Sequence, residues 1–221
     1  MVSLDFLDKN YVDSRSNLER IEESLLIDIL SGAYRHGQRI VEQEICNKFD
    51  ISRTPVREIL NRLVKTGLVE IIPNRGAFVI GLSPDEMDNI LQLRNLLYPQ
   101  AVYWAIENIT NSEFEMLEEV FGFISFYKPT GDIERILKFC RGFDKIIYDS
   151  THNRELNGLL LKYDFYIQYG LSRFSYPDNY LTILVDEYQK IYDAFRSRNP
   201  SLGMEAAQVH ITRSYLRSKI R

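Results

Sequence analysis

Residues 52–79 constrain the fold of this chain more than any other stretch. Their first half carries apolar side chains at helical spacing and ends at Gly67, a residue type that terminates helices. Two short β-prone runs follow, residues 68–72 and 77–80, on either side of the polar turn at residues 73–76. A helix followed at once by a two-stranded hairpin predicts a winged helix-turn-helix.

The residues before this stretch supply the rest of the same domain. Residues 17–30 carry apolar side chains at helical spacing, with acidic residues near their start. A second, shorter helix is predicted over residues 42–49. Ser52 or Thr54 can cap the third helix, whose first turn contains Pro55. We therefore expect three helices and a hairpin in the N-terminal domain.

The third helix presents two arginines to solvent. Arg53 and Arg57 lie one helical turn apart, away from the apolar face, so both can enter a major groove while the core stays dry. Thr54 lies beside them, and Arg75 precedes Gly76 at the wing tip, where a minor-groove or phosphate contact fits. For any single arginine, a solvated surface charge is an equally good interpretation. The order of turn, helix and wing favours binding of double-stranded DNA.

Charge is distributed unevenly along the chain. The formal net charge of −4 argues against a protein that coats nucleic acid without selection, because that mode needs a broad cationic surface. Residues 51–80, in contrast, contain five basic residues and two acidic ones. The basic character is therefore concentrated in the predicted DNA-reading unit.

Beyond Gly81 the sequence pattern is helical throughout. Ser83 to Glu86 has the capping-box spacing, with proline at the first helical position, and the helix that it opens runs to about Asn108. The same box pattern at Ser112 to Glu115 opens the next helix, which ends near residue 126. Further helical patterns, separated by turns at residues 151–152, 175–178 and 199–200, cover residues 132–150, 153–171, 180–197 and 202–220. Together they predict a bundle of about six helices.

These patterns predict a mostly α protein in two domains. We expect a flexible lead-in over residues 1–16, a winged helix-turn-helix with a small β-hairpin wing over residues 17–81, and an all-α antiparallel helical bundle over residues 82–221. No apolar run reaches the ~20 residues that cross a bilayer and no signal peptide is evident, so we expect a cytoplasmic protein without a membrane partner. Cys46 and Cys140 are expected to stay reduced.

The N-terminal part of the chain resembles a known family. The likeness spans roughly residues 17–80, and its motifs are Ser52 to Leu60, Leu63, Gly67 to Val69 and Arg75 to Val79. They are similar to the signature of GntR-type bacterial transcription regulators. The resemblance implies a homodimer that binds a near-palindromic DNA operator, with repression as the commoner outcome. Two-fold symmetry also agrees with physical reasoning, because one winged helix makes too few base contacts for strong specificity.

The remainder of the chain resembles the all-α FCD effector domain of the FadR subfamily. This weaker likeness is carried by Leu93 to Leu97, Phe143-Asp144, Asn153, Glu187-Tyr188 and His210. It implies that a small-molecule effector, a metabolite, binds in the bundle and controls the regulator.

Many FCD domains hold a divalent metal with an aspartate, a histidine four residues later, and two histidines from the last two helices. On this chain those positions fall at Cys140, Asp144, Tyr188 and His210, and His210 alone keeps the family identity. Aspartate, cysteine and histidine are all ordinary ligands, so the set does not forbid a metal. The exchanged groups nevertheless favour loss of the site, with His210 as a hydrogen-bonded interior histidine. We therefore expect no cofactor.

Arg94 completes the expected effector site with Cys140, Asp144, Tyr188 and His210. It matches an arginine of the family's first bundle helix, and it can either supply charge to a ligand or pair with an acid. The sequence leaves these alternatives open. The many aromatic residues of the bundle suggest a pocket for a larger or less polar effector, although aromatic residues at helical spacing more often form core.

Three functions were compared on these features. A dimeric, ligand-responsive DNA-binding regulator fits best, and an effector-independent DNA-binding dimer with the same fold is the alternative. An enzyme that uses a metal or carboxylate site is disfavoured, because the chain lacks a nucleophile elbow, a phosphate loop and an HExxH motif. Its three histidines, His36, His152 and His210, fall in unrelated settings.

Overall fold

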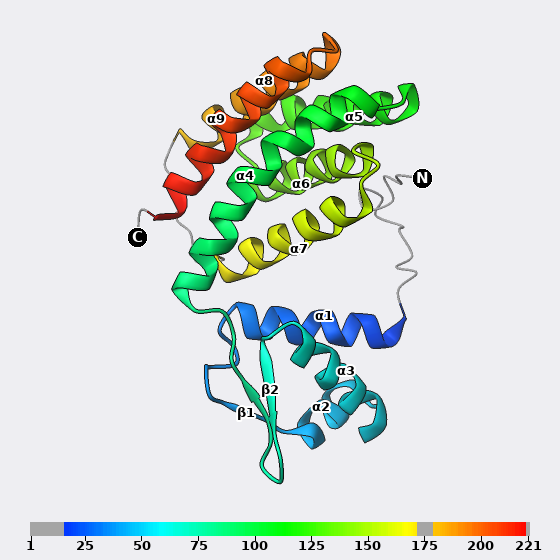
Figure 1. Ribbon diagram of the computed structural model, residues 1–221, viewed down its shortest axis with the longest axis vertical. Coiled ribbons are helices and arrows are strands. Elements are labelled where there is room, and N and C mark those ends of the chain that lie inside the picture. Colours follow the sequence, from blue (N-terminus) through cyan, green and yellow to red (C-terminus); the bar gives the residue numbers. More distant parts are fainter. Residues whose placement is uncertain (1–15, 172–178, 220–221) are drawn as a thin grey trace. The chain divides into compact units, whose positions relative to one another are not determined.

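The architecture is mostly helical, with one small antiparallel sheet, as the sequence predicts (Figure 1). The structure, a computed structural model, describes residues 16–171 and 179–219. Apart from Ser16, the predicted lead-in lies outside the described residues, and so does the turn predicted at residues 175–178. The chain forms two compact units, one built mainly from residues up to Asp88 and the other mainly from residues beyond it.

The N-terminal unit combines helices with a sheet of strand order β1-β3-β2. Its elements are α1 (Asn17–Leu30), β1 (Arg39–Ile40), α2 (Glu42–Phe49), α3 (Arg53–Lys65), β2 (Val69–Ile72) and β3 (Gly76–Val79). The sequence predicts the β2–β3 hairpin and a short extended piece ending at Ile40, but not that this piece, β1, joins the sheet. It pairs with the outer edge of β3, where Ile40 lies opposite Ala77. This third strand supports a hairpin that would be marginal alone.

The core of the N-terminal unit is organised by α3. Val56, Ile59 and Leu63 are fully buried along one side of this helix, and both α1 and α2 pack against it. Ser52 is the N-cap residue, one of the two predicted positions, but within the described chain its side chain makes no capping hydrogen bond. The apolar side of α3 therefore fixes which of its residues face solvent.

The second unit is a helical bundle. Its helices are α4 (Pro84–Asn108), α5 (Asn111–Tyr127), α6 (Ile133–Ser150), α7 (Arg154–Gly170), α8 (Tyr180–Arg196) and α9 (Pro200–Lys219), with the short 3-10 helix η2 (Lys128–Thr130) after α5. The pairs α5–α6 and α8–α9 make the most extensive helix contacts. None of the described helices is long and apolar enough to span a membrane.

Helix α4 runs through the bundle without a break, although Pro99 lies in its interior. Tyr98, next to this proline, is fully buried. Helix α9 approaches α4 closely at Gly203, where an added Cβ would meet Ile106 and stand 3.1 Å from Val102 Cγ1. Glycine at this position therefore sets the spacing of the two helices.

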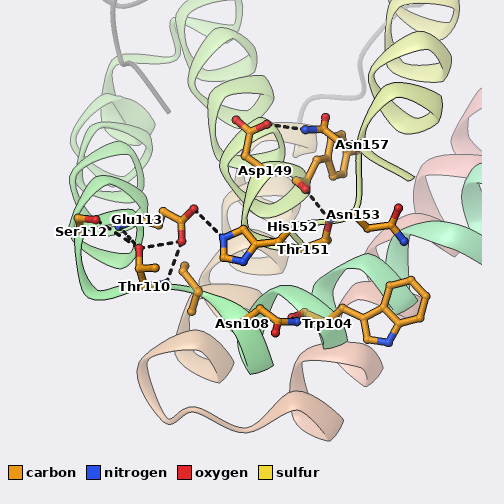
Figure 2. A network of polar contacts seen from close by, with 12 residues as sticks. Trp104, Asn108, Thr110, Ser112, Glu113, Asp149, Thr151, His152, Asn153 and Asn157 are labelled. Carbon is orange, nitrogen blue, oxygen red and sulfur yellow. Dashed lines mark hydrogen bonds and ion pairs between the residues drawn. The ribbon is translucent and has the colours of Figure 1, made fainter. Parts of the chain in front are cut away.

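A polar network ties the start of α5 to the turn between α6 and α7 (Figure 2). One carboxylate oxygen of Glu113 accepts hydrogen bonds from the N–H and the hydroxyl of Thr110, both at 2.8 Å. The other oxygen lies 3.2 Å from His152 Nε2. The sequence placed this capping box at Ser112, which is wrong. The N–H of Glu113 bonds the Thr110 hydroxyl, so α5 begins two residues earlier than the Ser112 pattern suggests.

Candidate functional site

The predicted DNA-reading face is the solvent side of α3. Arg53, Thr54 and Arg57 are all exposed there, while the opposite side of the helix is buried. The side chain of Arg57 keeps 63% of its surface open. Because three predicted contact residues share one exposed face, α3 can enter a major groove without disturbing its core.

Both arginines of this face are held by the first turn of α2. Arg57 Nε lies 3.1 Å from each carboxylate oxygen of Glu42, and Arg53 Nη2 donates to Gln43 Oε1 at 2.9 Å. Glu42 and Gln43 are not identifiable from the sequence, because spacing along the chain carries no signal for a contact between two helices. These residues fix where the arginine side chains point in the absence of DNA.

The wing adds a second pair of arginines. Arg75 is exposed, and its guanidinium lies 5.7 Å from the ring centroid of Phe78, within cation–π range. Gly76 has a φ of +99°, and a Cβ there would stand 3.3 Å from Arg39 Nε. Glycine thus permits both the turn and the close approach of Arg39, an exposed residue that the sequence analysis did not single out.

The predicted effector-site residues meet in a buried cluster inside the bundle, with Asp144 at its centre. Tyr98 donates to one carboxylate oxygen of Asp144 at 2.7 Å, and Tyr188 donates to the other at 2.9 Å. Arg94 Nη2 lies 3.8 Å from the same group. Burial raises the pKa of Asp144, and the nearby Asp164 carboxylate acts in the same direction.

Arg94 pairs with acids in this structure. Its side chain is buried, and its Nε donates to Asp164 Oδ1 at 2.5 Å, while the second oxygen of Asp164 accepts a hydrogen bond from Tyr148 at 2.7 Å. Burial alone would lower the pKa of Arg94, but Asp164 and the other neighbours raise it well above its ordinary value. The guanidinium therefore stays charged, and its charge is compensated inside the protein.

The tyrosine hydroxyls of the cluster act as neutral donors. Burial raises the pKa of Tyr98, Tyr148 and Tyr188 well above the usual value, and the neighbouring carboxylates of Asp144 and Asp164 add to the shift. Each hydroxyl consequently stays protonated and can donate a hydrogen bond to a carboxylate. In the sequence, Tyr98 and Tyr148 belong to the aromatic residues that suggest a pocket, and Tyr188 is a predicted effector-site residue. The structure adds their role as hydrogen-bond donors.

His210 joins the cluster from α9. Its Nδ1 lies 2.9 Å from Glu187 Oε2, and its ring centroid is 5.0 Å from that of Tyr188. Arg213 Nη1 reaches the other oxygen of Glu187 at 3.4 Å. Both His210 and Glu187 are buried. This environment is that of a hydrogen-bonded interior histidine.

The four positions that correspond to the family's metal ligands converge, but their chemistry does not fit a divalent metal. The set holds a single histidine, and Tyr188 donates its hydroxyl to Asp144 instead of offering an imidazole nitrogen. Burial also raises the pKa of the Cys140 thiol well above its usual value. Across residues 16–171 and 179–219, no group of three or more His, Cys, Asp or Glu side chains is arranged to hold an ion.

Two family models match the chain. Residues 17–79 match the model described as bacterial regulatory proteins, gntR family, and residues 89–213 match the FCD domain. The second match alone covers more than half of the 221 residues. The resemblance seen in the sequence is confirmed for both parts.

Individual relatives agree with the family models. The chain is 26% identical over 185 residues to the HTH-type transcriptional regulator YdhC of Bacillus subtilis, covering 83% of this chain and 80% of that protein. It is 25% identical over 222 residues to the galactonate operon transcriptional repressor of Escherichia coli, with coverage of 91% and 96%. The solved structure of E. coli McbR/YncC superposes with a TM-score of 0.69 at 22% identity, covering 90% and 95%, which shows a shared fold.

Removing the Tyr188 hydroxyl tests whether the buried cluster stabilises the domain. We expect Tyr188→Phe to lower the free energy of unfolding by about 2 kcal/mol, because a buried carboxylate loses a charge-assisted hydrogen bond. The substitution keeps the ring contacts with Phe143 and His210. Urea denaturation of both proteins measures the difference.

Tyr192→Phe is the matched control. The Tyr192 hydroxyl also donates to a carboxylate, that of Glu118 at 2.7 Å, but Glu118 is exposed and can bond water instead. Removal of the Tyr192 hydroxyl should lower the free energy of unfolding by less than about 1 kcal/mol. If the two variants lose the same free energy of unfolding, the buried Asp144 cluster contributes no more to stability than the exposed contact of Tyr192 with Glu118.

Proposed function

Because the chain belongs to the gntR family of bacterial regulatory proteins and carries an FCD domain, we propose that it is a repressor that binds a near-palindromic operator. Family membership makes it a DNA-binding transcriptional regulator rather than an enzyme. The observation that carries the proposal is that Arg53 and Arg57 are exposed on one face of α3, while the opposite face of the helix is buried. An operator on the bacterial chromosome places the protein in the cytoplasm.

The DNA-bound form is a homodimer. One α3 offers two arginines and a threonine to the major groove, which is too few contacts for the discrimination that an operator requires. Two copies related by two-fold symmetry present two reading helices to successive major grooves, about 34–36 Å apart. The operator should therefore contain two half-sites with the same symmetry.

Repression is the direction that we assign. The galactonate operon regulator, which aligns with 91% of this chain, is named a transcriptional repressor. Occupying an operator that overlaps a promoter is sufficient to block transcription, and it needs no contact with RNA polymerase. In this chain, the exposed face of α3 and the wing are the parts that would occupy the operator.

A small metabolite bound in the FCD domain is proposed to control the affinity of the protein for its operator. In the buried cluster the Arg94 charge is already paired with Asp164 and Asp144, so it offers no free positive centre to an acid. Neutral donors such as Tyr98 and Tyr188 surround the carboxylates instead. We therefore assign an effector that is recognised by hydrogen bonds and apolar contacts, without a metal.

Operator binding tests the DNA-reading assignment. The probe is the duplex that the full-length protein enriches from a randomised library, and fluorescence anisotropy measures its Kd at several salt concentrations. Arg57→Ala should weaken binding by ~1–3 kcal/mol if this side chain contacts a base. The Arg53→Ala/Arg57→Ala double variant should bind the selected duplex no better than an unrelated one.

Lys138→Ala is the control for a change in net charge. Lys138 is exposed on α6, outside the N-terminal unit, so its loss should leave the Kd unchanged. Unaltered operator affinity of the double variant would refute the assignment of α3 as the reading helix.

A metabolite screen tests the effector proposal. A compound that binds only the folded protein at about 100 times its Kd stabilises it by about 2.7 kcal/mol, which thermal-shift measurements detect. The same compound should change the affinity for the selected duplex. If compounds raise the melting temperature without changing that affinity, or if none binds, the protein acts as an effector-independent DNA-binding dimer.

A further inference from the structure

The first turn of α2 places a carboxylate directly beside the reading arginine Arg57. Both oxygens of Glu42 lie 3.1 Å from Arg57 Nε. The side chains of the pair are 63% and 33% exposed, for Arg57 and Glu42 respectively. Ion pairs with this exposure contribute little to folding stability. Stability alone therefore does not account for the pair.

A carboxylate at this position also weakens the attraction of the surface for DNA. Phosphate groups repel it, and it neutralises part of the positive charge that draws the protein to DNA. A surface selected for affinity alone would carry a neutral or basic residue there. Glu42 therefore has to be explained by something other than attraction to DNA.

The geometry of the contact supplies that explanation. Arginine has five N–H donors in a planar fork, and a guanine O6/N7 pair takes two of them. Among the residues described, the hydrogen bonds of Arg57 leave from Nε only, so its terminal Nη groups remain available. Fixing Nε fixes the plane of the guanidinium and reduces the rotamer freedom lost when a base is bound.

We infer that Glu42 is a positioning residue that orients Arg57 for base recognition, lowering general DNA affinity in exchange for sequence discrimination. The inference rests on the proposed DNA-binding function. Because both Glu42 oxygens face Arg57 Nε, positioning accounts for the contact better than direct reading of a cytosine amino group, which needs a free carboxylate oxygen.

The neighbouring contact provides an internal comparison. Arg53 is held by a neutral acceptor, Gln43, whose amide nitrogen also donates to Asn47 at 3.0 Å. Gln43 therefore adds no negative charge to the surface. Only the Glu42–Arg57 pair combines orientation with a charge penalty, so only Glu42 should show opposite effects on cognate and unrelated DNA.

The test is a selection from a randomised duplex library by four full-length proteins: wild type, Glu42→Gln, Arg57→Ala and Glu44→Gln. Glu44 is the matched control, because it lies in the same first turn of α2, is exposed and carries the same charge. Sequencing of the enriched duplexes gives the base preference at each position. Anisotropy titrations then give the Kd of each protein for the wild-type duplex and for an unrelated duplex.

Glu42→Gln should lose base preference at the same position as Arg57→Ala, with discrimination between the two duplexes reduced about tenfold. Its Kd for the unrelated duplex should be lower than that of the wild type, whereas Glu44→Gln should keep the wild-type base preference. A Glu42→Gln preference identical to the wild type overturns the inference, and so does a loss confined to a position that Arg57→Ala leaves intact. If the wild type itself enriches no sequence, the proposed function fails instead.

Discussion

Burial of the Arg94 guanidinium is the constraint on which the FCD domain depends. A buried cation is tolerated only when acids and hydrogen-bond acceptors surround it. Here Asp164 and Asp144 supply the acids, and tyrosine hydroxyls occupy the remaining carboxylate oxygens. The requirement links side chains from α4, α6, α7 and α8, so that compensation of one buried charge connects four helices.

The same cluster supports the proposal that this FCD domain needs no metal. An ion would bring histidine and carboxylate ligands from three helices together at one point. In this chain Asp144 receives Tyr98 and Tyr188 hydroxyls at 2.7 and 2.9 Å, and His210 turns to Glu187. Hydrogen bonds thus make the cross-links that coordination bonds would make, and the high pKa of the tyrosines keeps their protons in place.

The sequence predicted most of the fold because helical periodicity and capping motifs are local. Helix α4 ends at Asn108 as expected, and the exposed face of α3 follows from one amphipathic pattern. The features that were missed depend on contacts between segments. The two-residue strand β1 is too short to show which strand it pairs with. Overlapping box patterns at Thr110 and Ser112 cannot be ranked by spacing. The partnership of Glu42 with Arg57 likewise becomes visible only once α2 and α3 are packed together.

Metal content and chelation test this account of the FCD domain most directly. The protein, purified without chelator, is analysed for bound metals by mass spectrometry, and its melting temperature is recorded with and without EDTA. The account predicts far less than one ion per chain and an unchanged melting temperature, because a structural ion would stabilise only the folded state. About one tightly held ion per chain, together with a melting temperature that falls on chelation, would contradict it.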